Sequence, residues 1–367
     1  MSYQVGRMGL SEGAALIFIS LLPRVTLNSF TLVLSQQAQL GWLYLLINGL
    51  VVLFMAFLLV YIHSKIKGDL FAVTSILLGK KAACLIMGIL IVVFGGNAVL
   101  LIRQYAENTL ITAMPGMDVR VSILVYTLSA LAVTYFGASG ITRCSIIFMP
   151  LMIISFLAVT LLLYPFYIPY QLLPWQGNGL APCFVQGIKG AGYNAGFLAL
   201  FLFAPSFQNI KTLRHSLFQG IVASVLLKAY MMVIFIMVFG VAVGSEKTMP
   251  FFELARLIYL GRFFQHLEAF FIVTWVILGA LAIAINFFMV NYLLGRALDL
   301  PMIRPLMPCM AMLMCNLALL PEDINKTVQL DTKFILMNDL AIFVIPILLL
   351  AALWIKQRKG FEWGKSA

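Results

Sequence analysis

Charged residues are scarce in this sequence. Asp, Glu, Lys and Arg make up 10% of the 367 residues, whereas 63% are hydrophobic. A soluble domain devotes about a quarter of its residues to charge, so this composition excludes an ordinary soluble protein. Apolar runs of roughly 20 residues, the length that crosses the hydrocarbon core of a bilayer, recur along the chain. The sequence therefore predicts an all-α integral membrane protein.

Signals for catalysis and for nucleotide binding are also missing. The three histidines lie far apart, at positions 63, 215 and 266, near the ends of apolar runs. This spacing gives no basis for a metal cluster or a histidine-based triad. The phosphate-binding pattern GxxxxGK[ST] does not occur. The five cysteines lack metal-ligand spacing and are expected to be free thiols. We predict that the chain is not an enzyme and has no cofactor.

The apolar runs predict about ten transmembrane helices within a single transmembrane domain, residues 1–367. The main loops between them are predicted at 63–81, 165–184, 242–266 and 321–333. No small-residue cleavage site follows the first run, so it is not expected to be a signal peptide. The predicted spans are 12–35, 40–62, 82–112, 119–137, 142–164, 185–207, 213–241, 267–293, 303–320 and 334–355.

Basic residues are unevenly divided between the two sides of this predicted topology. Loops and tails on one side carry 14 basic and four acidic residues, whereas the opposite side carries seven of each sign. Cytoplasmic loops of membrane proteins carry the excess of Lys and Arg. Both termini are therefore predicted to be cytoplasmic. The net charge of +11 is explained by this topology and by contact with anionic membrane lipids, without nucleic acid.

Five charged residues fall within the predicted spans: Arg24, Arg103, Glu107, Lys228 and Asp339. A charge near the bilayer centre costs roughly 3 kcal/mol on insertion scales, so such residues usually face the bundle interior and pair. Arg103 and Glu107 are four residues apart, on one face of a helix. The sequence predicts that Glu107 pairs with Arg103 or with Arg24, and it does not distinguish the two.

Two spans contain features that interrupt a helix. Pro23 removes a backbone donor in the middle of the first span. The sixth span carries Gly187, Gly190, Gly192 and Gly196, which suggests an unwound segment around 192–196. Many transporters consist of two inverted halves with a broken helix at the start of each. Ten spans divide into repeats of about 12–164 and 185–355.

Each interruption also has a simpler interpretation. Gly192 and Gly196 form a small-xxx-small pattern that can serve helix packing alone. Arg24 can belong to a structural ion pair that fixes two helices, without any ligand contact. Both interpretations remain open at this stage.

Several motifs together resemble one family, the B subunits of endospore germinant receptors. This GerA-type spore germination permease family belongs to the amino acid–polyamine–organocation superfamily. The motifs are LPR at Leu22–Arg24, GW at Gly41–Trp42, DLFAVTSILLGK at Asp69–Lys80, RQYAE at Arg103–Glu107, ELARLIYLGRFFQHLEAFFIVTWV at Glu253–Val276 and LPEDINK at Leu320–Lys326. The resemblance implies a leucine-transporter-type fold, a 5+5 inverted repeat with broken helices 1 and 6. It also implies germinant sensing in the spore inner membrane, with A and C subunits as partners.

The resemblance implies that a small-molecule germinant, usually an amino acid, binds at the two breaks. We expect a small cavity there, and a bulky residue at Gly196 is expected to disturb ligand binding without lowering abundance. The predicted ligand-binding residues are Pro23, Arg24, Thr26, Asn97, Arg103, Glu107, Tyr193, Asn194, Gly196 and Phe197. Two alternatives stay open: a secondary transporter for an amino acid, and a scaffold or channel subunit without its own ligand.

Overall fold

The computed structural model describes residues 7–27, 29–258 and 268–358, and these ranges form a helical bundle without β-strands. Residues 259–267, which include His266 and part of the Glu253–Val276 motif, lie outside the described residues. The first helices are α1 (Leu10–Leu21), α2 (Ser29–Gln37), α3 (Gly41–Lys65), α4 (Leu70–Leu78), α5 (Lys80–Thr112), α6 (Val119–Tyr135) and α7 (Gly137–Leu162). They are followed by α8 (Leu180–Lys189), α9 (Ala199–Leu202), α10 (Ile210–Ser245), α11 (Pro250–Arg256), α12 (Glu268–Ala297), α13 (Leu306–Ala318) and α14 (Ile324–Arg358).

The ten predicted spans coincide with helical segments, which confirms the predicted all-α membrane fold. Within the described ranges, six stretches are long and apolar enough to cross a membrane: Ser29–Lys65, Lys80–Thr112, Gly137–Leu162, Ile210–Ser245, Ala269–Ala297 and Ile324–Arg358. Helices α1, α6 and α13 are shorter apolar helices. The first span is divided into α1 and α2, and the sixth into α8 and α9.

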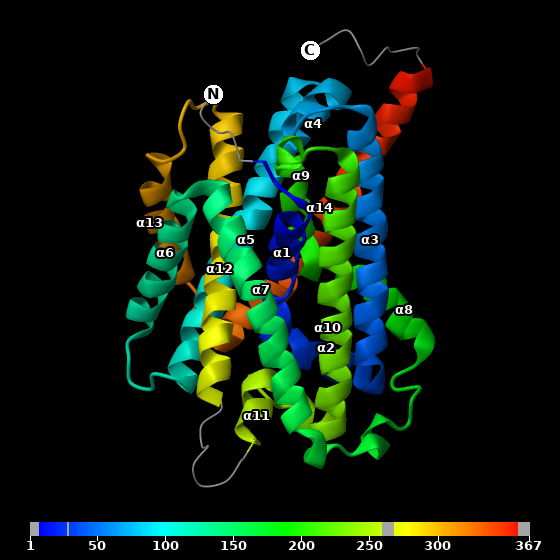
Figure 1. Cartoon of the computed structure of the whole chain (residues 1–367), viewed down its shortest axis with the longest axis vertical. Helices are drawn as coiled ribbons and strands as arrows, with labels where there is room; N and C mark the ends of the chain where they lie inside the picture. The colour runs from blue at the N-terminus through cyan, green and yellow to red at the C-terminus, as the bar shows by residue number, and fades with distance from the viewer. Residues whose placement is uncertain (1–6, 28, 259–267, 359–367) are drawn as a thin grey trace.

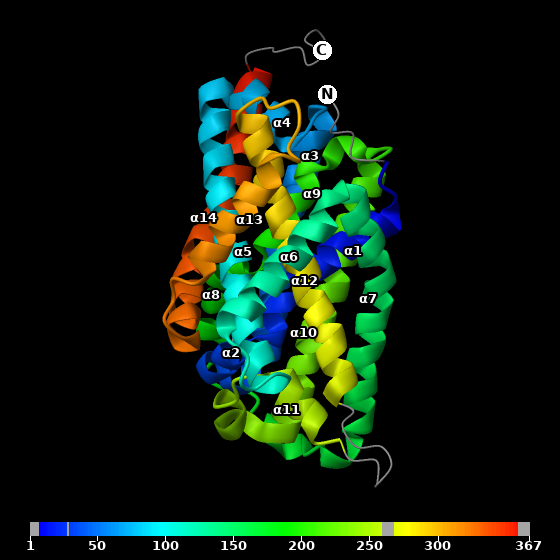
Figure 2. The ribbon, with the colours of Figure 1, turned by 90° about the vertical axis from the view of Figure 1, so that its left-hand side faces the viewer.

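The breaks of the two spans lie inside the bundle, whereas α8 lies at its outer edge (Figure 1). Helix α1 packs against α7, α10 and α12, and α12 packs in turn against α5, α6 and α7 (Figure 2). On the other side α3 packs against α10, α8 and α14. Large apolar side chains such as Phe18, Phe94 and Phe197 are fully buried where these helices meet. This surrounding layer shields the irregular backbone of the breaks from lipid, as a membrane interior requires.

The break in the first span is confirmed, and local side chains satisfy part of its backbone. Helix α1 ends at Leu21, a short 3-10 turn covers Pro23–Thr26, and α2 begins at Ser29. The Thr26 hydroxyl donates to the carbonyl of Pro23 at 2.7 Å, and the Ser29 hydroxyl donates to the carbonyl of Arg24. These side-chain bonds add to the backbone bonds of the 3-10 turn, at the point where the α-helical hydrogen bonds are interrupted.

The break in the sixth span is also confirmed. Helix α8 ends at Lys189 and is followed by a 3-10 segment, Gly190–Leu198 (η5), before α9 begins at Ala199. Within η5, Asn194 leaves helical geometry, with φ −112° and ψ 22°. The Gly192 amide donates to the carboxylate of Asp339 on α14, which satisfies a donor released by the break. Both broken helices of the predicted fold are therefore present.

The predicted loops were wrong in part, because short or polar helices lie within them. Helix α4 occupies 70–78, α8 begins at Leu180, and α11 occupies 250–256. The largest error concerns 321–333, where α14 begins at Ile324. The Asp323 carboxylate caps this helix by accepting from the Lys326 amide at 2.8 Å. The first turns of α14 are polar, and hydropathy alone assigned them to a loop.

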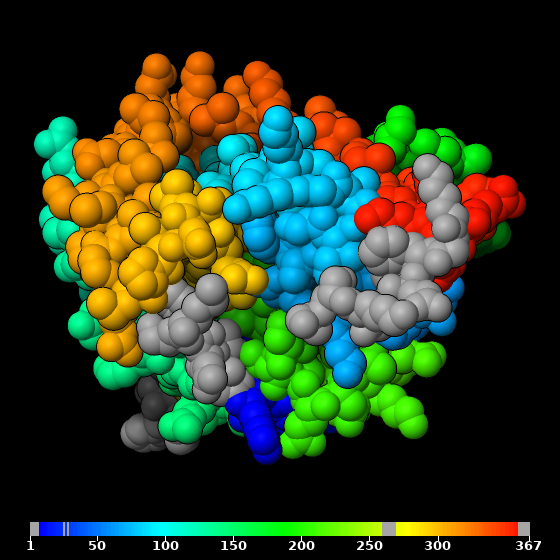
Figure 3. Space-filling model, turned by 90° about the horizontal axis from the view of Figure 1, so that it is seen from above, coloured from blue at the N-terminus to red at the C-terminus, as the bar shows by residue number. Residues whose placement is uncertain are grey.

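The described chain begins and ends at the same end of the bundle (Figure 1). The last turn of α3 and the first turns of α5 and α10 lie at this end as well, and they carry Lys65, Lys80 and Lys211. Figure 3 shows this end of the molecule, with α4 and the start of α5 at its centre. The shared position of the two ends agrees with an even number of spans.

Candidate ligand site at the helix breaks

Arg24 is the centre of a buried polar network at the break of the first span. Its Nη1 atom donates to both carboxylate oxygens of Asp331, at 2.7 and 2.8 Å, and its Nη2 atom donates to Asn97 Oδ1 at 2.6 Å. The side chains of Arg24 and Asp331 are 10% and 7% exposed. A guanidinium this deeply buried needs a paired and hydrogen-bonded anion, and Asp331 supplies it.

Two further groups of hydrogen bonds connect the break to neighbouring helices. Asn97 on α5 is joined to Asn338 on α14, with Asn338 Nδ2 donating to Asn97 Oδ1 at 3.1 Å. On the other side of the break, the Thr26 hydroxyl accepts from Trp275 Nε1 at 3.0 Å and lies 3.2 Å from the Tyr105 hydroxyl. The first break is therefore fixed to α5, α12 and α14 through side chains.

Residues of η5 contact Arg24 and two other helices. The Tyr193 ring lies under the Arg24 guanidinium, 5.8 Å from the ring centroid, within the range of a cation–π contact. Asn194 accepts from Lys228 Nζ on α10 at 2.7 Å and donates to Asn48 on α3. The two breaks thus face one another, with Arg24 and Asn194 on opposite sides.

The space between the breaks is nearly filled. A cavity of about 20 Å³ is lined by Arg24, Ser29, Phe30, Val33, Tyr44, Leu45, Asn48, Tyr193, Asn194 and Lys228. This volume accommodates about one water-sized group. A free amino acid does not fit, so the structure is closed around the breaks.

The predicted site residues divide into three groups. Arg24, Tyr193 and Asn194 line the cavity, and Asn97 binds Arg24 directly. The second group consists of Pro23, Thr26, Gly196 and Phe197. These residues lie within the two breaks, buried or partly buried, and are not among the residues that line the cavity. The third group, Arg103 and Glu107, lies further along α5.

Gly196 has no room for a side chain. A Cβ atom at this position would come within 2.9 Å of the Cβ and the carbonyl oxygen of Ser20 on α1. A leucine there would push η5 away from α1. We therefore correct the expectation that a bulky residue at Gly196 leaves abundance near normal, because this glycine is a packing position.

Glu107 pairs with Arg103, and the alternative pairing with Arg24 was wrong. Arg103 Nε donates to Glu107 Oε1, and the side chains are 5% and 12% exposed. Arg103 also donates to the carbonyls of Ala318 and Glu322, at 3.4 and 3.2 Å. Arg103 lies six residues beyond Asn97, or about 9 Å along the helix. This pair connects α5 to the α13–α14 loop and takes no part in the Arg24 network.

We expect Arg103→Leu or Glu107→Leu alone to lower the folded abundance more than both together. Removing one member leaves a buried charge without its partner, which typically costs about 3–5 kcal/mol. The double variant removes both charges and keeps apolar volume. Size-exclusion chromatography of fluorescently tagged protein measures the folded fraction. A double variant as depleted as the sum of the two singles would contradict a coupled pair.

Sequence reasoning missed Asp331 and Asn338. Both lie on α14 seven residues apart, hence on one helical face, and they are 5% and 0% exposed. Asp331 was overlooked because it fell in the predicted loop 321–333. The spacing was a usable signal: Asp331, Asn338, Ile342 and Ile345 follow helical periodicity, and each is buried.

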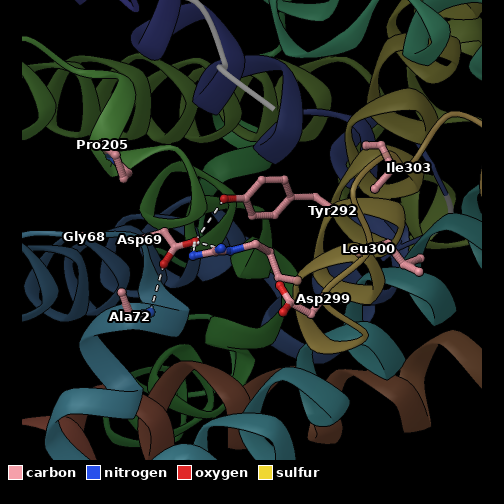
Figure 4. A pocket seen from close by; sticks show the side chains of 10 residues that line it. Gly68, Asp69, Ala72, Pro205, Tyr292, Asp299, Leu300 and Ile303 are labelled. Carbon is pink, nitrogen blue, oxygen red and sulfur yellow. Dashed lines mark hydrogen bonds and ion pairs between the residues drawn. The ribbon is translucent and has the colours of Figure 1, made fainter. Parts of the chain in front are cut away.

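A second polar cluster lies at the end of the bundle that carries α4 (Figure 4). Asp69 accepts from the Tyr292 hydroxyl at 3.0 Å and from Arg296 Nε at 2.8 Å, while its other oxygen caps α4 at the Ala72 amide. These residues border a pocket of about 280 Å³ between α4 and the end of α12. The cluster fixes α4 to α12, because Asp69 satisfies both helices at once. In the part of the chain that the structure describes, no group of three or more His, Cys, Asp or Glu side chains is placed to hold a metal ion.

Comparisons with known proteins address the chain as a whole. A family model described as "spore germination protein" matches residues 10–327. No curated protein shows significant sequence similarity to the chain.

Among solved structures, the chain is similar to Mhp1, a nucleobase-cation-symport-1 family transporter in a closed conformation with bromovinylhydantoin bound. The TM-score is 0.68 at 11% identity, covering 98% of this chain and 95% of that one. It is also similar to a manganese transporter from Eremococcus coleocola, with a TM-score of 0.63 at 12% identity, covering 94% of this chain and 76% of that one. At such low identity these similarities establish the fold, a leucine-transporter-type bundle.

Proposed function

Because this chain belongs to the spore germination protein family, we propose that it senses a small nutrient at the two helix breaks. The observation that carries the proposal is the small cavity between η5 and the Pro23–Thr26 turn, bordered by the polar side chains of Arg24, Tyr193 and Asn194. Charged and amide side chains at membrane depth usually mark a ligand pathway. The fold and the family together support a permease-like membrane protein.

The closed cavity suggests how ligand binding is coupled to a conformational change. The present volume of about 20 Å³ does not admit an amino acid, so a ligand binds only when the breaks move apart. A ligand that binds the open arrangement better shifts the population toward it. The Arg24–Asp331 pair joins the first break to α14, so the same movement reaches a helix that lies outside the cavity. Such coupling suits a sensor.

The proposed membrane and partner subunits follow from the family, and the proposed orientation follows from the charge distribution. We propose that the chain acts in the spore inner membrane with the A and C subunits of a germinant receptor. The excess of basic residues at the end of the bundle where the described chain begins and ends supports a cytoplasmic location for that end. Anionic lipid headgroups are then in reach of these residues.

Substitution of Tyr193 tests the proposed site. Tyr193→Ala removes the aromatic wall beside Arg24, and we expect the germinant concentration for half-maximal germination to rise at least about tenfold, which corresponds to ~1.4 kcal/mol of binding. The germination response of spores is measured against germinant dose, with subunit abundance determined in parallel. Tyr170→Ala is the matched control, because Tyr170 lies in a connecting segment and is 81% exposed. An unchanged dose response at normal abundance would favour a scaffold subunit without its own ligand.

Solute transport is the second candidate, because the fold is that of known transporters. Uptake of labelled amino acids into proteoliposomes that contain the chain distinguishes transport from sensing. A transporter accumulates or equilibrates the label, whereas a sensor binds it and leaves the internal concentration unchanged.

A further inference from the structure

Lys228 is a buried cation without a carboxylate partner among the described residues. It lies in the middle of α10 and is 4% exposed. Its Nζ atom donates to Asn194 Oδ1 at 2.7 Å, a neutral acceptor. Two carboxylates of α14 that lie at the breaks are engaged elsewhere: Asp331 binds Arg24, and Asp339 accepts from the Gly192 amide. An ammonium group carries three donors, and only one is used here.

The direction of the hydrogen bonds around Lys228 is fixed. Lys228 only donates, so the oxygen of Asn194 faces it and the amide nitrogen of Asn194 donates to Asn48 Oδ1. The Nδ2 group of Asn48 is then left as a donor. It is buried and makes no hydrogen bond of good geometry within the described residues, although the Tyr44 hydroxyl lies beside it. An unsatisfied buried donor costs about 1–3 kcal/mol, so its presence indicates a missing acceptor.

Both unsatisfied groups belong to the cavity of about 20 Å³ described above, which Tyr44 and Arg24 also line. The cavity therefore brings the side chains of Lys228, Asn48, Tyr44 and Arg24 together with apolar side chains of α2 and α3. The one carboxylate bound to Arg24 does not line it. Its volume matches a single water-sized group, such as a halide ion or the end of a carboxylate.

From this arrangement we infer that the cavity binds an anionic group between Lys228 and Asn48. The anion accepts from Lys228 Nζ and Asn48 Nδ2, and it neutralises the second cation beside the break. Two sources share this chemistry: a free halide ion, and the carboxylate of the nutrient. The carboxylate source rests on the proposed function, whereas halide binding is independent of it.

Thermal unfolding of the purified full-length chain in detergent tests the inference. Chloride is titrated against sulfate, a larger dianion, at matched ionic strength so that general screening is constant. In a second arm each proteinogenic amino acid is added. For every amino acid that stabilises the chain, its amide, which lacks the carboxylate, is then tested in the same way. Binding to the folded state raises Tm with dose. Lys228→Met removes the charge at similar volume, and Asn48→Leu is the second variant. Lys211→Met, an exposed lysine on the same helix, is the control.

Chloride-dependent stabilisation of the wild type and of Lys211→Met, lost in Lys228→Met or Asn48→Leu, supports a halide site. Stabilisation by an amino acid but not by its amide, lost in the same variants, supports the carboxylate source. The inference is overturned if neither chloride nor any amino acid raises Tm. It is also overturned if Lys228→Met and Asn48→Leu show the same rise in Tm as the wild type. In that case the proposed function still stands if Tyr193→Ala raises the germinant concentration needed for half-maximal germination.

Discussion

Replacing Asp331 by leucine is expected to produce a severe loss of folded protein. The substitution leaves the buried Arg24 guanidinium with Asn97 as its remaining hydrogen-bond acceptor. Breaking a buried pair by removing one partner costs about 3–5 kcal/mol, because the other charge stays buried and uncompensated. A loss of this size is a large share of the stability of a typical protein, about 5–15 kcal/mol. Folded abundance and Tm in detergent measure the effect.

The double variant Arg24→Leu with Asp331→Leu is the decisive comparison for this pair. Without either charge no uncompensated ion stays buried, and Asn97 keeps its hydrogen bond with Asn338, so we expect folded abundance to recover well above that of Asp331→Leu. Glu322→Leu controls for the loss of a carboxylate, since the Glu322 side chain is exposed near the start of α14. If the double variant is no more abundant than Asp331→Leu, the two charges do not stabilise one another. The germinant response of a recovered double variant then reports whether Arg24 is needed for sensing.

Gly192→Leu is expected to have the second large effect. A Cβ atom here would collide with the Ile335 carbonyl oxygen, and it would lie 3.1 Å from Asn338 Cβ. The carbonyl belongs to the backbone of α14 and cannot rotate away. Overpacking of this kind typically costs ~1–3 kcal/mol and more where backbone must move. The new side chain also displaces the Gly192 amide from Asp339. Folded abundance should fall strongly in the same chromatographic assay.

Gly88→Leu is the matched control for Gly192→Leu. Gly88 is also a helical glycine, on α5, but a Cβ atom there meets no heavy atom within 4 Å. Leucine favours a helix over glycine by roughly 0.8 kcal/mol, so Gly88→Leu should be neutral or slightly stabilising. Equal losses in the two variants would mean that close packing of η5 against α14 is not what requires glycine at 192.

Much of the architecture could be predicted because it depends on local chemistry. Apolar runs of sufficient length specify spans whatever their neighbours are. Pro23 interrupts α1 because proline lacks the amide donor that a helix needs at that point. Arg103 and Glu107 pair because four residues of helix bring them to one face. Each of these features involves residues within one or two helical turns.

The candidate site was only partly predictable, because its contacts join residues that are distant in sequence. Arg24 and Asp331 are 307 positions apart, and Asn194 and Asn48 are 146 apart. Hydropathy also misassigned the start of α14, since a helix that buries Asp331 on one face and exposes Lys333 on another has a polar average. Lys228 was visible as a charge within a span, but the absence of a carboxylate partner for it among the described residues was not.

The sequence by itself thus determined a membrane protein of about ten helices, with breaks at Pro23 and near Gly192, because length, hydropathy and backbone chemistry act locally. The tertiary structure alone decided which acid neutralises Arg24, that the cavity between the breaks is closed to about 20 Å³, and that Gly196 serves packing. Those outcomes depend on how α1, α3, α5, α10, α14 and η5 meet, since burial in a low dielectric makes each charge dependent on the partner that packing supplies.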